Sequence, residues 1–195
     1  NKSFSKIFLN ESKKICEKIN CDHIENIANI ISKIKKNKGR IFFLGVGGSA
    51  GNASHAVNDF RKLCNIDAYT PVDNVSEITA KTNDEGFETI FDTYLKLSSF
   101  EKKDVLMVFS VGGGNYKKKV SIGLIKAIKF ASKKSGKIIS IVGRSDGYAY
   151  KNSTISIFVD VEDKKLATPI SETFQALIWH LLVSHPKLQV NKTKW

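Results

Sequence analysis

Cysteine is scarce in this sequence. The 195 residues include three cysteines, an odd number, and none of them form a Cys-x-x-Cys pair. A framework of disulfide bonds is therefore not expected. A few isolated thiols are typical of a protein in a reducing compartment, so we expect a cytoplasmic location.

Long apolar runs are also lacking. No stretch approaches the roughly 18 consecutive apolar residues that a membrane-spanning helix needs. The first residues, Asn-Lys-Ser-Phe, do not begin the apolar core of a secretory signal peptide. Neither a linker nor an internal repeat interrupts the chain. We therefore expect one globular domain over residues 1–195, with no membrane partner.

Acidic residues are outnumbered by basic ones, with 31 Lys and Arg against 19 Asp and Glu and a net charge of +12. The lysines are scattered, and aromatic residues do not alternate with them as a base-stacking surface requires. A nucleic-acid partner is therefore not favoured. General attraction of phosphorylated ligands is the safer interpretation.

Hydrophobic periodicity predicts an α/β fold. Continuous apolar runs predict three strands buried on both faces of a parallel sheet, at residues 40–44, 104–110 and 137–143. An alternating pattern predicts an edge strand at 153–161, and a short strand is predicted at 68–70. Helical spacing predicts helices at 4–19, 24–34, 50–64, 75–82, 87–95, 120–135 and 168–185.

This order of elements predicts a three-layer sandwich. A mainly parallel sheet of about five strands should lie between helices on both faces. The two helices within residues 1–37 should pack on this domain or on a partner subunit.

Two of the predicted buried strands run into glycine-rich turns that lead to helices. Ligands of open α/β sheets bind beyond the carboxyl ends of the strands, where free N–H groups and helix N-termini favour phosphate. The alternative is two ordinary tight turns. The candidate phosphate- or substrate-binding residues are Gly47, Gly48, Ser49, Ser110, Gly112, Gly113, Gly114 and Asn115.

A nucleotide cofactor is not expected. The first turn matches a dinucleotide fingerprint only loosely, and the acidic residue that should follow has only Asp67 as a poor candidate. No glycine precedes a Lys-Ser/Thr pair at the spacing of a Walker A motif. A dinucleotide-dependent oxidoreductase is therefore the weakest functional hypothesis.

Two helices carry imidazoles and carboxylates. His55 and Asp59 are four residues apart on one helix face, and Glu172 and His180 are eight apart on the last helix. Such a set suits a zinc-type ion or proton transfer between carboxylate and imidazole. The alternative is a solvated His–Asp pair and a buried structural histidine. Asp84, in a polar turn, could be a turn residue or a ligand of sugar hydroxyls.

These residues together resemble one family, the phosphoheptose isomerases of the SIS (sugar isomerase) type. Gly45-Val46-Gly47-Gly48-Ser49 with the following His55 and Asp59 is similar to their Gly-Asn-Gly-Gly-Ser helix. Asn83-Asp84-x-Gly86-Phe87 resembles their Asn-Asp-x-Gly-Phe turn. The segment 110–115 takes the place of their serine-rich phosphate loop, and 172–180 resembles their last helix, which carries Gln and His.

The resemblance implies an aldose–ketose isomerase that converts sedoheptulose 7-phosphate to a heptose 7-phosphate through an enediol, for bacterial surface polysaccharides. It implies a homotetramer with active sites between subunits. Asp59 and His180 take the places of the Glu and His that exchange protons. It also implies zinc, bound in some members by residues that match His55, Asp59, Glu172 and His180.

The sequence departs from the family at four places. Val46 replaces an Asn, and the second turn lacks hydroxyl groups at positions 111, 112 and 115. Asp59 is one methylene shorter than the family Glu, and Glu172 replaces a Gln. These changes keep a metal-ligand set but leave a second hypothesis open. The chain could be a non-catalytic sugar-phosphate sensor, including the type that associates with replication initiators.

Overall fold

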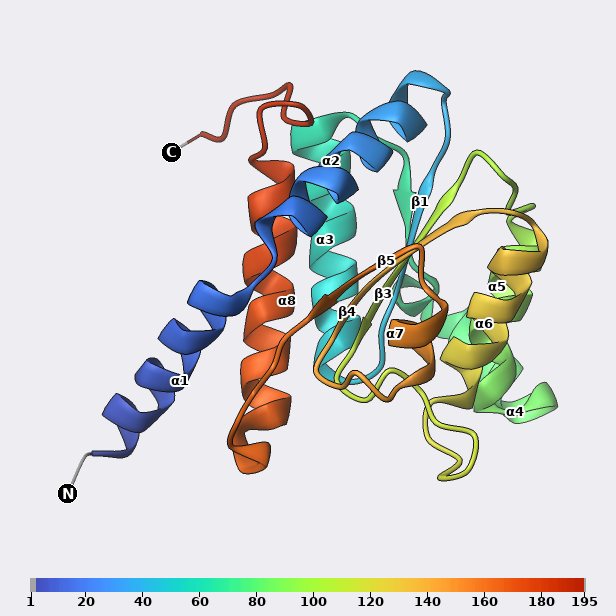
Figure 1. The fold of residues 1–195 in the computed structure, drawn as a ribbon. Helices are drawn as coiled ribbons and strands as arrows, with labels where there is room; N and C mark the ends of the chain where they lie inside the picture. The colour runs from blue at the N-terminus through green and yellow to red at the C-terminus, as the bar shows by residue number, and fades with distance from the viewer. Residues whose placement is uncertain (1–2, 195) are drawn as a thin grey trace.

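A computed structural model describes residues 3–194 and contains one five-stranded sheet (Figure 1). All strand pairs are parallel, in the order β2-β1-β3-β4-β5. The prediction of a mainly parallel sheet between two helical layers is confirmed. The strands are β1 (Ile41–Leu44), β2 (Ala68–Tyr69), β3 (Val105–Ser110), β4 (Lys137–Val142) and β5 (Ile155–Phe158).

Eight α-helices accompany the sheet in the described part of the chain. They are α1 (Phe4–Lys18), α2 (Cys21–Lys36), α3 (Gly48–Cys64), α4 (Val75–Glu85), α5 (Ile90–Leu97), α6 (Ile122–Lys133), α7 (Tyr148–Asn152) and α8 (Ala167–Val183). Three short 3-10 helices are η1 (Pro71–Asp73), η2 (Phe87–Thr89) and η3 (Lys164–Leu166). No helix of the described residues is long and apolar enough to cross a membrane.

The sheet is buried on both faces because successive side chains of a strand point to opposite sides. In β1, Phe43 joins the core under α2, α3 and α8, whereas Phe42 joins the core under α5, α6 and α7. Figure 1 shows these helices in layers on the two sides of the sheet. This two-sided burial explains the continuous apolar runs of β1, β3 and β4.

The two N-terminal helices differ in how they are held. Helix α2 packs on the domain through buried isoleucines, among them Ile27 and Ile31. Helix α1 extends away from the body (Figure 1) and buries only Glu11 and Ile15. Its residues Phe4 and Leu9 are 68% and 66% exposed. Helix α2 therefore packs along the domain, whereas α1 contacts it through fewer residues.

Several predicted boundaries were wrong. The edge strand is shorter than 153–161, and α7 fills part of the loop before it. The helix predicted at 120–135 begins at Ile122, after a hairpin in which Asn115 pairs with Val120. The helix predicted at 75–82 continues to Glu85, so Asp84 lies in its last turn rather than in a loop.

The strand order places a topological switch between β1 and β3. From β1 the chain proceeds to β2 on one side, whereas β3, β4 and β5 follow on the other side. Crevices at such switch points, outside the carboxyl ends of the strands, are where open α/β sheets bind ligands. Both glycine-rich turns begin at this point, because they follow β1 and β3.

Candidate functional site

The first glycine-rich turn connects β1 to α3. Gly47 has a φ of 63°, a conformation that residues with a Cβ rarely adopt. A Cβ on Gly45 would overlap the backbone of Ser49. These two glycines let β1 turn directly into α3, so the free N–H groups of the first helical turn lie at the switch point.

Glu172 lies at the same place. A Cβ on Gly48 would overlap its carboxylate, so this side chain of α8 lies against the first turn of α3. A negative charge is stabilised there by the partial positive charge of a helix N-terminus. The carboxylate of Glu172 therefore already faces the position at which a phosphate on this turn would lie.

The second glycine-rich turn follows β3. The Oγ atom of Ser110 accepts a hydrogen bond from the N–H of Gly113 at 3.0 Å, which folds the turn back on the strand. Gly113 and Gly114 have φ angles of 69° and 82°. Their carbonyls accept from the N–H groups of Ala149 (2.8 Å) and Tyr148 (2.9 Å) at the start of α7.

This arrangement leaves donors for a ligand. Within residues 3–194, the N–H groups of Gly112 and Gly114 have no hydrogen-bond acceptor. A Cβ on Gly112 would meet nothing within 4 Å, so the space in front of this residue is open. Free N–H groups beside open space are what a backbone phosphate site requires.

Asn115, a predicted phosphate- or substrate-binding residue, is also part of a hairpin. Its backbone forms two hydrogen bonds with Val120, of 2.9 and 3.0 Å, and its Oδ1 atom accepts from the N–H of Lys118 at 3.0 Å. Residues 115–120 thus form a hairpin that separates the glycines from α6. The side-chain oxygen of Asn115 stabilises that hairpin.

Ser121 directly follows the hairpin, and the sequence analysis did not single it out. Ser121 occupies the N-cap position of α6, in a left-handed conformation, and its side chain makes no capping hydrogen bond. The available signal was a serine directly before an apolar periodic segment. The predicted start at residue 120 placed it inside the helix instead.

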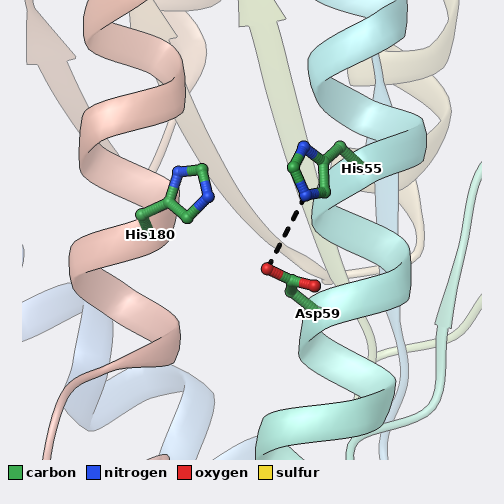
Figure 2. Close-up of side chains that lie close together, drawn as sticks. All are labelled: His55, Asp59 and His180. Carbon is green, nitrogen blue, oxygen red and sulfur yellow. Dashed lines mark ion pairs between the residues drawn. The ribbon is translucent and has the colours of Figure 1, made fainter. Parts of the chain in front are cut away.

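His55, Asp59 and His180 converge between α3 and α8 (Figure 2). One ligand atom from each lies within 4.8 Å of the others, and the Nε2 atom of His55 is 3.8 Å from Oδ2 of Asp59. Both histidines are exposed, and Asp59 is half-buried. The predicted pairing of these two helices is therefore present in the structure.

Hydrogen bonds orient the three side chains. Nδ1 of His180 lies 2.8 Å from the carbonyl of Ala176, to which it can donate a proton, so Nε2 keeps its lone pair. Nδ2 of Asn58 donates to Oδ1 of Asp59 at 2.8 Å, which leaves Oδ2 facing His55. The ring of Trp179, which is fully buried, lies against both histidines.

This group fits a zinc-type ion by its chemistry. Two imidazoles and one carboxylate are a set that catalytic zinc sites use, with a further position left for water or substrate. A metal-binding histidine also usually donates its second ring N–H to a carbonyl or carboxylate, as His180 can.

Glu172, predicted as a fourth metal ligand, is not part of this group. Eight residues of helix separate it from His180, a rise of about 12 Å. That distance places its carboxylate at the start of α3 instead.

Two amide side chains, a partly buried Asn52 and a buried Gln175, hold the backbone of Glu172 in place and were not identified from the sequence. The Nδ2 atom of Asn52 donates to the carbonyl of Glu172 at 2.9 Å and to Oε1 of Gln175 at 3.2 Å. Gln175 is fully buried. Because no motif includes either residue, only their position between α3 and α8 reveals the role.

Two other acidic candidates lie apart from these groups. Asp84 is exposed and accepts a hydrogen bond from its neighbour Asn83 at 2.8 Å. Asp67 comes directly before β2, at the opposite end of the strand from the glycine-rich turns. It is therefore not placed as the acidic residue of a dinucleotide site.

Comparisons with known proteins agree with this architecture. The family model described as "SIS domain" matches residues 7–143. A phosphoheptose isomerase of Buchnera aphidicola is 31% identical over 142 residues, which cover 71% of this chain and 70% of that protein. The lincomycin biosynthesis protein LmbN of Streptomyces lincolnensis is 30% identical over 148 residues, 72% of this chain but only 54% of LmbN.

Solved structures show the same fold. The phosphoheptose isomerase of Neisseria gonorrhoeae superposes with a TM-score of 0.76 at 24% identity, over 92% of this chain and 94% of that one. That of Francisella tularensis gives 0.77 at 22% identity, over 94% and 97%. With a matching family model and a relative above 30% identity, the chain belongs to the SIS domain family and, within it, to the phosphoheptose isomerases.

Proposed function

We propose that this protein is an aldose–ketose isomerase that converts sedoheptulose 7-phosphate to a heptose 7-phosphate. The observation that supports this most is the convergence of His55, Asp59 and His180 in a chain of this family. An aldose–ketose isomerisation moves protons between two adjacent carbons and their oxygens. Such a reaction needs groups that take up and return protons, and imidazole and carboxylate are suited to that work.

The phosphate is expected on the second glycine-rich turn. The free N–H groups of Gly112 and Gly114 and the hydroxyl of Ser110 offer donors there. The first turn is less suitable, because the carboxylate of Glu172 would repel a phosphate dianion. Gly47, Gly48, Ser49 and Glu172 are therefore assigned to the sugar hydroxyls, for which a carboxylate is a good acceptor.

Proton transfer is assigned to Asp59 and His180. The carbonyl of Ala176 holds the His180 ring with Nε2 available as a base. The free Oδ2 atom of Asp59 can accept a second proton. The shorter side chain of Asp59, compared with the Glu of the family, sets its carboxylate back by about one C–C bond.

Zinc is proposed as the cofactor, held by His55, Asp59 and His180. When bound, a zinc ion would act as a Lewis acid that polarises a carbonyl oxygen of the sugar. A lone pair that binds zinc cannot also accept a proton, so the metal and base roles exclude each other both for Oδ2 of Asp59 and for Nε2 of His180. Removal of the metal distinguishes the two roles.

The resemblance implies a homotetramer. Such an oligomer would bring together the two parts of the site, the glycine-rich turns and the His–Asp group. Eleven residues of α3 separate Gly48 from Asp59, which is about 16 Å of helix. A site between subunits would let the turns of one copy face the His–Asp group of another. The exposed apolar residues of α1 offer surface for such contacts.

The first experiment is metal analysis of the purified protein, with the sedoheptulose 7-phosphate isomerase assay before and after chelation. Zinc close to one per chain and turnover that chelation abolishes would support the proposal. His180→Ala should lose turnover but keep the fold, and His23→Ala, an exposed histidine outside the group, is the matched control.

Other outcomes have definite meanings. Turnover that survives chelation would make Asp59 and His180 bases rather than metal ligands. Sugar-phosphate binding without turnover or metal would contradict the enzyme assignment and favour the sensor hypothesis.

A further inference from the structure

A pocket lies at the end of the sheet opposite to the glycine-rich turns. It is bounded by the end of α2, the turn before β3 and the start of β4, and its volume is about 630 Å³. Pockets of this volume hold small organic molecules. None of the residues assigned to phosphate, sugar or metal lines it. It is therefore separate from the crevice at the switch point.

The floor of the pocket is apolar and aliphatic. Ile30 and Ile34 of α2 line it, and Ile34 belongs to the core under α2, α3 and α8. The loop after α2 lies directly on the turn before β3, since a Cβ on Gly39 would overlap the carbonyl oxygen of Lys103. Among the described residues that line the pocket, none is aromatic. Its apolar surface therefore consists of isoleucine side chains and the methylene groups of lysines.

The rim of the pocket is positively charged. Three separate segments contribute its lysines, which are Lys33, Lys102, Lys103 and Lys137. Glu101 is the one acidic residue among the described residues that line it, and its carboxylate lies 3.0 Å from Nζ of Lys103. Four lysines against one glutamate leave a net charge of +3. That charge is complementary to an anion.

Most of these lysines are available to a ligand. In the described part of the chain, Lys33, Lys102 and Lys137 form no ion pair, and the side-chain amide of Asn37, which also lines the pocket, forms no hydrogen bond. Lys33 lies in the last turn of α2, where a cation stabilises the helix end. Lys102 and Lys137 lie outside the helices, so that explanation does not apply to them. The same charges oppose the docking of this face against its counterpart on a second copy of the chain.

We propose that this pocket binds an organic anion that carries an aliphatic chain. The chain lies along Ile30 and Ile34, and the anionic group pairs with Lys102 and Lys137. A single-stranded nucleic acid is disfavoured, because its bases need aromatic side chains on which to stack. A neutral sugar is disfavoured because it would leave the lysines unpaired. This assignment does not rest on the proposed isomerase activity.

The test is an NMR titration of the full chain, labelled at its isoleucine methyl groups, with octanoate. The methyl signals of Ile30 and Ile34 should shift and reach saturation. Lys102→Glu and Lys137→Glu should each weaken the affinity by about tenfold, which is ~1.4 kcal/mol. Lys6→Glu is the matched control, since Lys6 is exposed and does not line the pocket. Its affinity for octanoate should equal that of the wild type.

Two further probes separate the chain from the charge. 1-Octanol has the same chain without the charge, so it should bind several-fold more weakly and lose nothing further in Lys102→Glu. Acetate has the charge without the chain and should leave the two isoleucine signals unchanged. Equal affinities for octanol and octanoate, or equal losses in Lys102→Glu and Lys6→Glu, would overturn the proposal. So would binding to vesicles that contain an anionic phospholipid without any binding of octanoate, because the face would then meet a membrane surface. Thermal denaturation confirms that each variant is folded.

Discussion

At the scale of single residues, Glu172 shows how one side chain can change a site. Where the family has a neutral Gln, this chain places a carboxylate against the first turn of α3. The charge lies at a helix N-terminus, which stabilises it and at the same time disfavours other anions there. The sequence shows that residue 172 is a glutamate, but it does not show that this side chain lies against Gly48.

Glu172→Gln should therefore strengthen the binding of inorganic phosphate at the first turn, as distinct from the second-turn site proposed for the sugar phosphate, by roughly fivefold, the effect of about 1 kcal/mol between charges a few ångströms apart in water. Calorimetric titration measures the affinity, and Glu17→Gln on α1 is the control. Zinc content should stay unchanged, because Glu172 lies outside the His–Asp group. Loss of zinc in Glu172→Gln would restore the four-ligand site, and an unchanged phosphate affinity would refute the repulsion argument.

Of the three cysteines, Cys64 should react most slowly with a thiol reagent. Cys16 and Cys21 are exposed, whereas Cys64 is buried, and desolvation raises its pKa to about 11. Since the thiolate is the reactive form, Cys64 stays protonated and protected at pH 8. A disulfide-exchange reagent should modify two thiols rapidly in the native protein and all three in denaturant. Rapid reaction of three native thiols would contradict the burial of Cys64.

At the scale of elements, α1 is attached to the body through few buried residues. Its contacts with the body centre on one segment, where Glu11 accepts hydrogen bonds from the backbone N–H groups of Glu162 and Asp163. Lys14 and Lys18 also donate to the carboxylate of Glu162, at 2.6 and 2.9 Å. These contacts set the direction in which α1 leaves the domain.

Glu11→Ala should release α1 while the rest of the fold remains, because two backbone N–H groups lose their acceptor. Hydrogen exchange should become fast in α1 and stay slow in α3 and α8. Glu17→Ala, which removes an exposed carboxylate of the same helix, is the control. Unchanged protection of α1 in Glu11→Ala would show that other contacts hold it.

The attachment of α1 should also depend on pH. Hydrogen bonds from Lys14 and then Lys18 lower the pKa of Glu162 to about 2. A carboxyl group whose folded pKa lies below its unfolded value, about 4.3, stabilises the folded form fully above that value. This contribution is lost as the pH falls toward 2. The protection factors of the α1 amides, which compare the intrinsic exchange rate with the observed rate at the same pH, should fall over that interval in the wild type but not in Glu162→Gln.

At the scale of the whole molecule, one ion pair joins the starts of the two strands that carry the glycine-rich turns. Arg40 donates to both carboxylate oxygens of Asp104 and to the carbonyls of Ser98 and Ser99. Asp104 is fully buried and also accepts from the backbone of Arg40 and Glu101. The pair therefore connects β1, β3 and the end of α5.

Asp104→Asn should destabilise the fold by about 3 kcal/mol, because Arg40 loses its charge partner in a half-buried place. For a chain of this size the midpoint of thermal unfolding should fall by roughly 6–12 °C. Asp146→Asn breaks an exposed pair with Arg144 and should leave the midpoint unchanged. Similar midpoints for both variants would mean that burial does not make the Arg40 pair more important.

The sequence by itself determined the class of fold and singled out the candidate residues of the site. Apolar runs and their spacing depend on local periodicity, so the strands, the two-sided sheet and most helices could be predicted. His55, Asp59 and His180 stood out because few residue types bind metals or transfer protons.

Only the tertiary structure decided which residues meet. The distance along α8 separates Glu172 from the His–Asp group and brings it to Gly48, and the hairpin at 115–120 engages the Oδ1 atom of Asn115. The supports from Asn52 and Gln175 likewise join segments far apart in the chain. Local patterns specify helices and strands. Contacts between side chains depend on how those elements pack, and no periodic pattern in the sequence encodes the packing.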